Sequence, residues 1–386
     1  MGDVWLAGSA RTPIASHGGK FAGVSATELG SISVRATLAR SGLSAEGVDE
    51  VIVGNVLSAG LGQNVARQVS IGAGIPESIP TTSINKVCGS GLKAVMLAAQ
   101  AIQCDDADAV VAGGTENMTR APHVTPTVLN PKRSPEGEPV DVMIRDGLWD
   151  VYEDTLMGTY GDRCAEKYGL SREAQDDFAV ASYQRALASQ ESGHFDREIV
   201  PIETPNGTVD ADEEPARFDE EKLRGLRPAF GESGTITAAN ASSINDGAAS
   251  IAVMSSARLS ASGTTASARI VGYASAAREP AWFTLAPILA ISRLLAQLDL
   301  QVGDIDLFEI NEAFSCVPMA AMAELSIPHD KVNVLGGAVA LGHPIGASGC
   351  RTLVTLLNAM ETRDAKRGIV SLCIGGGEAV AMAVER

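Results

Sequence analysis

The chain repeats one pattern of residues in its two halves. In the first half, Cys88-Gly89-Ser90-Gly91-Leu92-Lys93 opens a helical segment that leads to a β-branched run and then to Gly113-Gly114. In the second half, Ala347-Ser348-Gly349-Cys350-Arg351 opens a similar segment that leads to Gly375-Gly376-Gly377. With the two Ser-Gly pairs aligned, both stretches stay in step through a helix and a strand. The sequence therefore predicts two similar α/β halves that face each other.

Short β-branched runs alternate with Ala-rich helical segments in both halves. A helix is expected after Cys88, where apolar residues recur at helical spacing, and strands are expected at 51–53, 81–87, 108–111, 305–310 and 368–372. Alternation of this kind is typical of buried, largely parallel sheets with helices outside. We therefore expect an α/β fold.

The segment between the two halves has a different amino-acid composition. Five prolines from Pro122 to Pro139 lie in a polar segment that is unsuited to a regular core element. A charged helical segment at 171–191 and an acidic run at 210–221 follow. Trp149 and Met157 argue for an inserted loop domain over a loose linker. The predicted domains are an N-terminal half at 1–118 completed by 235–262, a loop domain at 119–234 and a C-terminal half at 263–386.

The net charge and the cysteine content limit the kinds of ligand that the protein is expected to bind and the compartment in which it is expected to lie. The formal net charge of −17 disfavours a surface for nucleic acid or for an anionic membrane, so an anionic ligand needs a local basic patch or helix N-termini. Six cysteines without CxxC spacing are typical of reduced thiols. The N-terminal stretch shows no secretory signal, and no span of ~20 apolar residues is visible. We expect a soluble cytoplasmic protein. Removal of a transit peptide that preceded this sequence is an alternative that the sequence leaves open.

Four short segments carry side chains suited to covalent catalysis. Cys88 precedes a helix N-terminus, whose dipole favours the thiolate, although a buried structural cysteine is the alternative. His343 lies among glycines and proline, where its ring either accepts a thiol proton or donates to a developing oxyanion, or is a satisfied loop histidine. Cys373 precedes three glycines whose N–H groups are suited to bind an oxyanion. Asn311 follows a predicted strand, where it either holds a water or caps the surface.

Taken together, these segments resemble the ordered signature of the thiolase family. The resemblance begins at 11–13, reaches the C-terminus and includes 53–56, 85–91, 240–242, 245–247, 311–314, 336–338, 342–344 and 373–377. It implies two similar βαβαβαββ halves in a layered α/β/α/β/α fold with an inserted loop domain. It also implies an acyltransferase that requires no metal or redox cofactor.

The resemblance also implies a role for each of five residues. Cys88 takes an acyl group from acyl-CoA after His343 activates its thiol. Cys373 then removes an α-proton from a second acetyl-CoA, whose carbanion attacks the Cys88 thioester. His343 and a water held by Asn311 form one oxyanion hole, and the N–H groups of Cys88 and Gly375 form the other.

Further residues correspond to the family's CoA-binding positions. Ser242 matches a serine of this kind, and Arg217 and Lys222 match basic side chains near the nucleotide phosphates less securely. Ion pairs of the two basic residues with the acidic side chains at 219–221 are an equally good interpretation.

The acyl pocket of the family is expected to involve four residues of this chain. Leu156 precedes Met157-Gly158, where many biosynthetic members have a histidine instead. Phe283 lies in Phe283-Thr284-Leu285-Ala286-Pro287, which resembles short-chain members, and would shorten the pocket. Phe314 ends the Asn-Glu-Ala-Phe segment. Glu378, after the glycine triplet, occupies a position that varies in the family.

Two further features of the family have counterparts here. The potassium-binding positions of cation-activated members resemble Tyr183, Ala238, Ala239, Ala241 and Val339. The proline-rich stretch near 119–140 resembles the family's tetramer-forming loop. A potassium ion and a homotetramer, as a dimer of dimers, are therefore expectations from the resemblance.

The leading hypothesis is an acetyl-CoA C-acetyltransferase that binds acetyl-CoA, acetoacetyl-CoA and CoA. The nearest alternative is a degradative 3-ketoacyl-CoA thiolase of fatty-acid β-oxidation. A ketosynthase-like or HMG-CoA-synthase-like condensing enzyme is a further alternative, against which the second cysteine at 373 argues. A non-enzymatic lipid-binding or scaffold protein would lack catalytic residues that this chain retains.

Overall fold

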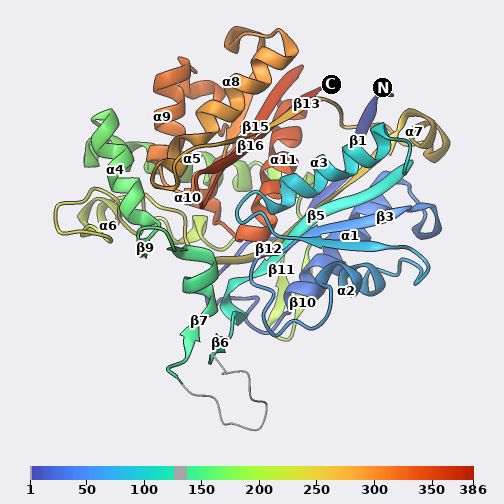
Figure 1. Cartoon of the computed structure of the whole chain (residues 1–386), viewed down its shortest axis with the longest axis horizontal. Coiled ribbons are helices and arrows are strands. Elements are labelled where there is room, and N and C mark those ends of the chain that lie inside the picture. The colour runs from blue at the N-terminus through green and yellow to red at the C-terminus, as the bar shows by residue number, and fades with distance from the viewer. Residues whose placement is uncertain (1, 126–136) are drawn as a thin grey trace.

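The computed structural model describes residues 2–125 and 137–386. A ten-stranded sheet runs through the molecule in the order β14-β15-β16-β13-β1-β12-β5-β3-β4, with β2 paired to β12 (Figure 1). Its strands are β1 (Val4–Arg11), β2 (Ala15–Ser16), β3 (Glu50–Gly54), β4 (Thr81–Ile84), β5 (Ala109–Asn117), β12 (Asn245–Ser255), β13 (Ala268–Ala277), β14 (Leu307–Ile310), β15 (Arg367–Ile374) and β16 (Glu378–Glu385). The seam between β1 and β13 consists of two residue pairs, which join the strands of the two halves.

The sheet is mixed. Strand β3 runs parallel to β4 and β5, and β14 runs parallel to β15. Strand β12 pairs antiparallel with both β5 and β1, and β16 pairs antiparallel with both β15 and β13. The prediction of largely parallel sheets is therefore wrong, because each half adds antiparallel strands that the alternation of runs did not distinguish.

Two helices form a layer between the sheet regions of the two halves, α3 (Ser90–Gln103) and α11 (Ile345–Thr362). Every residue of α11 up to Met360 is buried, so the helix is covered on all sides. A Cβ added to Gly91 would lie 2.6 Å from the Cys350 nitrogen, and one added to Gly349 would lie 2.3 Å from the Leu92 nitrogen. The two Ser-Gly pairs that align in the sequence are thus where the central helices touch.

Other helices cover the outer faces of the sheet. Helices α1 (Ala26–Ser41) and α2 (Val65–Gly72) pack against β1, β3 and β12, and α8 (Ala286–Leu298) and α9 (Cys316–Leu325) share a core with β13, β15 and β16. Helix α1 begins at its cap Ser25, whose Oγ accepts from the Glu28 N–H at 3.2 Å. The order of layers is helix, sheet, helix, sheet, helix, as the resemblance implied.

One helical stretch among the described residues, Pro280–Leu298, is long and apolar enough to cross a membrane by length and composition. Its most apolar window is 56% buried within the protein. Because α8 packs on the sheet with its apolar side chains, this stretch has the properties of a core helix.

The segment between the halves contains α4 (Gly158–Tyr168), α5 (Arg172–Glu191) and α6 (Glu220–Gly225). Three short hairpins accompany them, β6 (His123–Val124) with β7 (Val140–Asp141), β8 (Trp149–Asp150) with β9 (Thr155–Leu156), and β10 (Ile202–Thr204) with β11 (Gly207–Val209). Helices α4 and α9 pack together at one side of the molecule (Figure 1). The stretch at 119–140, predicted to form the tetramer, lies partly outside the described residues, because 126–136 are not described.

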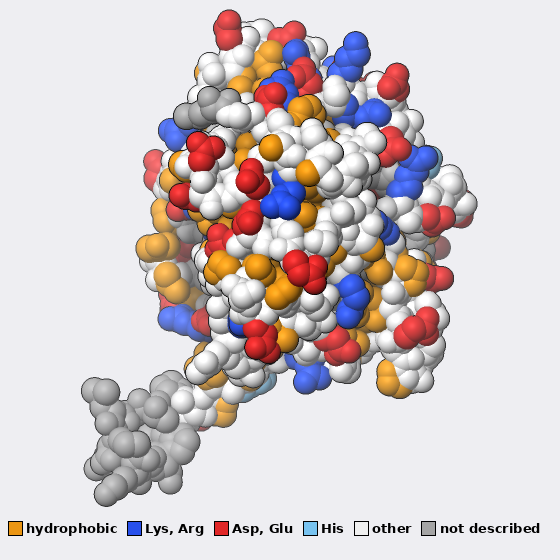
Figure 2. Space-filling view, turned by 90° about the vertical axis from the view of Figure 1, so that its right-hand side faces the viewer, with side chains coloured by type: hydrophobic (Ala, Val, Ile, Leu, Met, Phe, Trp, Pro, Cys, Tyr) orange, Lys and Arg blue, Asp and Glu red, His pale blue; other side chains and the backbone are white. Residues whose placement is uncertain are grey.

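Charged side chains of both signs are interspersed on the face of the molecule shown in Figure 2. Elsewhere on the surface, exposed ion pairs include Arg163 with Glu153 at 2.7 Å and Arg224 with Asp177 at 2.8 Å. The two remaining short helices are α7 (Ser256–Ser262), which follows β12, and α10 (Ala338–Leu341), which precedes α11.

Candidate active site

Cys88 lies in a tight turn between β4 and α3. The strand predicted at 81–87 ends at Ile84. Val87 cannot continue it, because its φ of +46° lies outside the β region. A β-branched residue rarely adopts such an angle. The Ser90 hydroxyl holds the turn, since its Oγ accepts from the Lys86 N–H at 2.8 Å and donates to the Val87 carbonyl at 2.7 Å. The turn leaves the Cys88 side chain half-buried. Backbone strain of this kind is concentrated at functional sites.

The Cys88 thiol is protonated at neutral pH. Burial raises its pKa to about 11, although the N–H of Gly375 acts in the opposite direction. The helix dipole, from which we predict a favoured thiolate, and burial therefore act in opposite directions on this pKa, and the thiolate stays a prediction. Helix α3 begins at Ser90, two residues after the cysteine. A nearby base has to take the proton when the sulfur reacts.

His343 lies in the loop between α10 and α11, with its ring buried. Its Nδ1 is 2.6 Å from the Ser348 Oγ, and that hydroxyl donates to the Pro344 carbonyl at 2.8 Å. The hydroxyl therefore accepts from Nδ1–H, which leaves the lone pair on Nε2. Burial, with a smaller contribution from the Arg351 charge, lowers the pKa of His343 to about 3. The neutral ring is thus arranged to accept a proton at Nε2.

Asn311 connects the end of β14 to the histidine. Its Nδ2 lies 3.5 Å from the His343 Nε2, and its backbone N–H donates to the Ser371 carbonyl at 3.0 Å. Its Oδ1 is buried and has no hydrogen-bond partner among the described residues. A buried acceptor in this state fits a bound water or a polar substrate atom.

Cys373 is the second sulfur of the site. It lies buried near the end of β15, and burial raises the pKa of its thiol, to which the proximity of Cys88 adds. The Gly375 N–H, two residues later, donates toward the Cys88 sulfur. A Cβ on Gly375 would lie 3.3 Å from the Met157 Cε, so the methionine covers the turn. The structure therefore brings residues 88, 373 and 375 together.

Sequence reasoning missed Glu116, a buried carboxyl group at the end of β5. Its Oε2 accepts from the N–H groups of Val56 at 3.0 Å and Gly346 at 2.9 Å. Its Oε1 accepts from the Leu57 N–H at 3.2 Å and from the Asn55 Nδ2 at 2.8 Å. The carboxyl group thereby joins the loop after β3 to the first turn of α11, next to the histidine. Its signal in the sequence is an acid within an otherwise apolar and glycine-rich strand.

Three of the four residues predicted for the acyl pocket lie in one apolar cluster. Phe283 and Phe314 are buried, with ring centroids 6.5 Å apart in an edge-on arrangement, and Met157 packs against the same cluster. Two aromatic residues that sequence reasoning missed extend it, since Tyr160 lies 6.1 Å from Phe283 and Phe230 lies 6.3 Å from Phe314.

Leu156 lies apart from this cluster. Its side chain is 36% exposed, and it pairs with Trp149 in the hairpin of β8 and β9. The leucine therefore belongs to the rim of the site, one residue before the methionine that covers Gly375.

The predicted CoA-binding residues lie on two separate segments. The Ser242 Oγ donates to the Ala313 carbonyl at 3.1 Å, which places the serine beside the Asn311–Phe314 segment. Arg217 is exposed and lies 4.0 Å from Glu213 and 3.7 Å from Glu214, so its acidic neighbours precede it in the chain instead of following it. Lys222 is exposed on α6.

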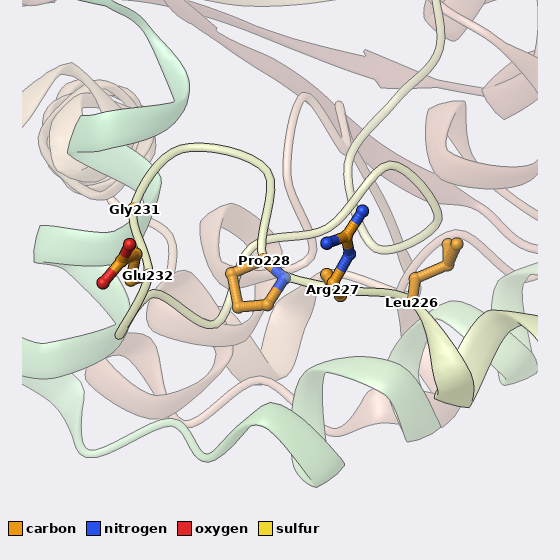
Figure 3. A pocket seen from close by; sticks show the side chains of 5 residues that line it. All are labelled: Leu226, Arg227, Pro228, Gly231 and Glu232. Carbon is orange, nitrogen blue, oxygen red and sulfur yellow. The ribbon is translucent and has the colours of Figure 1, made fainter.

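A surface hollow of about 760 Å³ opens directly after α6 (Figure 3). It is lined by Leu226, Arg227, Pro228, Gly231 and Glu232. Figure 3 shows the side chains of Leu226, Arg227 and Pro228 along one extended stretch of chain. The arginine was not singled out in the sequence, because it lies in a loop without a recognised motif.

The positions predicted for potassium are only partly brought together. Tyr183 stacks on Phe218 with ring centroids 5.0 Å apart, and it shares an apolar cluster with Ala239 and Val339. Ala241 belongs to the cluster around Phe283 and Phe314, and Ala238 is exposed. The described part of the chain holds no group of three or more His, Cys, Asp or Glu side chains suited to a metal ion.

Two family models match adjoining parts of the chain. The model described as "Thiolase, N-terminal domain" matches residues 4–257, and "Thiolase, C-terminal domain" matches residues 264–386. Together they identify an enzyme of the acyltransferase class. The chain belongs to the thiolase family.

Relatives of known name and structure match over the full length. Acetyl-CoA acetyltransferases of Cupriavidus necator and Pseudomonas aeruginosa are each 50% identical, over 396 and 392 residues, with 100% of both chains covered. The crystal structure of Acat5 thiolase from Ascaris suum in complex with coenzyme A superposes with a TM-score of 0.95 at 43% identity. That likeness covers 100% of both chains and agrees with the layered fold described above.

Proposed function

We propose that this thiolase is an acetyl-CoA C-acetyltransferase, which condenses two acetyl-CoA to acetoacetyl-CoA and CoA through an acyl group on Cys88. The observation that carries the proposal is the convergence of two sulfur atoms and the Gly375 N–H, with the neutral His343 beside Asn311. Full-length identity to relatives named acetyl-CoA acetyltransferase supports the short-chain substrate. It favours this activity over a degradative 3-ketoacyl-CoA thiolase.

In the first half of the reaction, the Cys88 sulfur attacks the thioester carbon of acetyl-CoA while His343 Nε2 takes the thiol proton. The thiol is protonated and the ring is neutral beforehand, so the proton moves with the attack. The N–H groups of Cys88 and Gly375 bind the oxygen of the tetrahedral intermediate. The carbon–sulfur bond to CoA breaks, and Cys373 gives its proton to the departing CoA sulfur.

In the second half, the Cys373 thiolate removes an α-proton from a second acetyl-CoA. His343 and a water on the free Asn311 Oδ1 hold the enolate oxygen. The α-carbon forms a bond to the acyl carbon on Cys88, and the bond from that carbon to sulfur breaks. The protonated His343 returns its proton to the Cys88 sulfur, so all three groups end as they began.

The proposal is tested by incubating the protein with acetyl-CoA and locating the acetyl group by peptide mass spectrometry. We expect acetylation of Cys88, none in Cys88→Ala, and acetylation without acetoacetyl-CoA formation in Cys373→Ala. An acetyl group on another residue would contradict the proposal. Turnover of acetoacetyl-CoA against a 3-ketoacyl-CoA of eight or more carbons tests chain length, and faster turnover of the long substrate would favour the degradative alternative.

We also propose that a potassium ion binds near Tyr183. Burial raises the pKa of its hydroxyl to about 12, to which the charges of Glu214 and Glu312 add, and these two carboxylates would attract a cation. The hydroxyl and nearby backbone carbonyls would hold the ion and stiffen the loop at 238–241. Equal activity in potassium and sodium buffers would contradict this site.

We further propose that the protein is a homotetramer and that it lies in the cytoplasm. The described cysteines are all free thiols, which is compatible with a reducing compartment. Light scattering of the purified protein tests the oligomeric state, and fractionation of the source cells tests the compartment.

A further inference from the structure

The two loops that carry Cys88 and Gly375 come from different halves of the chain and meet face to face. A Cβ added to Gly89 would lie 2.4 Å from the Ile374 Cδ1, so the first loop rests directly on the end of β15. Gly375 lies beside the turn that carries Cys88, since a Cβ added to it would be 3.9 Å from the Val87 Cγ1, and its N–H acts to lower the pKa of the Cys88 thiol. The position of this N–H therefore depends on how the two loops are held together.

The second loop has little of its own to fix it. Gly376 and Gly377 adopt φ angles of +90° and +94°, and residues 375–377 have no side chains. The Arg278 N–H donates to the Gly377 carbonyl at 2.8 Å, and Ile374 and Glu378, on either side of the turn, face each other in the ladder of β15 and β16. A glycine turn of this kind is conformationally permissive, so its ends decide where its N–H groups point.

An ion pair joins the two loops at the far end of the turn. Lys86, two residues before Cys88, pairs with Glu378, the first residue after the glycines. The two side chains are 24% and 40% exposed, so the pair is partly shielded from water. Lys93 lies close to Lys86, since the charge of Lys86 adds to burial in lowering the pKa of Lys93. The negative charge of Glu378 therefore compensates the positive charges of two neighbouring lysines, Lys86 and Lys93.

We propose that the Lys86–Glu378 ion pair is a clasp that positions the Gly375 N–H against the Cys88 sulfur. Neither side chain is assigned contact with the reacting atoms, so both are positioning residues that act through the backbone of the turn. The inference rests on the proposed function, in which the N–H groups of Cys88 and Gly375 bind the oxygen of the acyl group on Cys88. His343 and Asn311 lie on other segments of the chain, in the loop before α11 and directly after β14.

The clasp therefore has an unequal effect on the two halves of the reaction. Acyl transfer to Cys88 depends on the Gly375 N–H, whereas removal of the α-proton depends on Cys373, His343 and Asn311. Loosening the clasp slows the first and leaves the second nearly unchanged. A simple loss of folded protein would lower both in proportion.

The test uses Glu378→Gln and Lys86→Gln in the full-length protein, with Glu385→Gln as the matched control. Glu385 lies at the other end of β16 and pairs with Arg269 and Arg367 at 2.9 Å each. We expect single-turnover acetylation of Cys88 to slow about ten-fold in both clasp variants, because small misplacements of a catalytic group are costly. The KM for acetyl-CoA and the rates of the control should stay within about two-fold.

Two further measurements separate positioning from folding. With Cys88 already acetylated, deuterium exchange from heavy water into the methyl group of a second acetyl-CoA reports the α-proton step, and Glu378→Gln should leave its rate unchanged. The double swap Lys86→Glu with Glu378→Lys should recover most of the lost acetylation rate. Parallel loss of both half-reactions, equal loss in the control, full activity of Glu378→Gln, or a swap without recovery would overturn the clasp. An unmodified protein that takes no acetyl group on Cys88 would instead overturn the proposed function.

Discussion

At the residue scale, the buried imidazole of His343 links stability to pH. Its pKa is lowered from 6.5 to about 3, so between these values the unfolded chain binds a proton that the folded protein does not. Stability therefore falls as the pH decreases below 6.5. We expect His343→Gln to lose less stability than the unmodified protein between pH 6.5 and 5, by about 2 kcal/mol. Urea unfolding at the two pH values measures the difference.

The matched control for this change is His123→Gln, at an exposed histidine of β6. It should retain the pH dependence of the unmodified protein. If His343→Gln instead loses stability in parallel with the unmodified protein, the ring is protonated in the folded state over this range, and Nε2 is not free to act as a base.

Glu116 gives a second prediction at this scale. Both of its oxygens accept from N–H groups, so the amide nitrogen of a glutamine would face a donor in either orientation. We expect Glu116→Gln to lower the free energy of unfolding by about 2–3 kcal/mol, since it leaves buried donors unsatisfied. Urea denaturation measures this, and Glu50→Gln is the control, because the Glu50 carboxylate accepts from a threonine hydroxyl at the sheet edge. An unchanged unfolding midpoint would show that the site admits a donor.

At the scale of elements, the crossing of α3 and α11 leaves no room for a side chain. A Cβ on Gly349 would lie 2.3 Å from a backbone nitrogen of α3, which cannot give way as a flexible side chain would. We expect Gly349→Ala to lower the free energy of unfolding by about 3 kcal/mol through overpacking. Gly303→Ala, where no atom lies within 4 Å, should change it little. Thermal unfolding compares the two, and equal melting temperatures would contradict the close crossing.

The same elements show what the sequence could predict. Local sequence signals, either a glycine-rich stretch or the end of a predicted strand, lie next to Cys88, His343, Asn311 and Cys373. The segments that carry these residues could therefore be predicted. The positive φ of Val87 and the antiparallel neighbours of β5 and β15 depend on distant strands, and local patterns contain no record of them. The hydrogen-bond partners of Glu116 lie as far as 230 residues away in the chain. The sequence therefore shows an unusual acidic residue but does not show which segments it joins.

At the scale of the whole molecule, the two halves depend on each other. Helix α11 is buried almost throughout, with the strands of both halves contributing to its core. We expect residues 263–386, expressed alone, to lack a cooperative thermal transition, because one side of α11 would be exposed to water. Circular dichroism of the fragment, alone and mixed with residues 1–262, measures this. A fragment that melts cooperatively by itself would contradict the dependence.

The glycine turn that meets Cys88 begins at Gly375, which is 287 residues further along the chain. During synthesis, the sulfur of the first half therefore leaves the ribosome long before the strand that supplies its facing N–H exists. Until β15 and this turn emerge, a nascent chain holds a thiol without the groups that would make it reactive. Premature termination before the turn would therefore yield a product that is inert as well as incompletely packed.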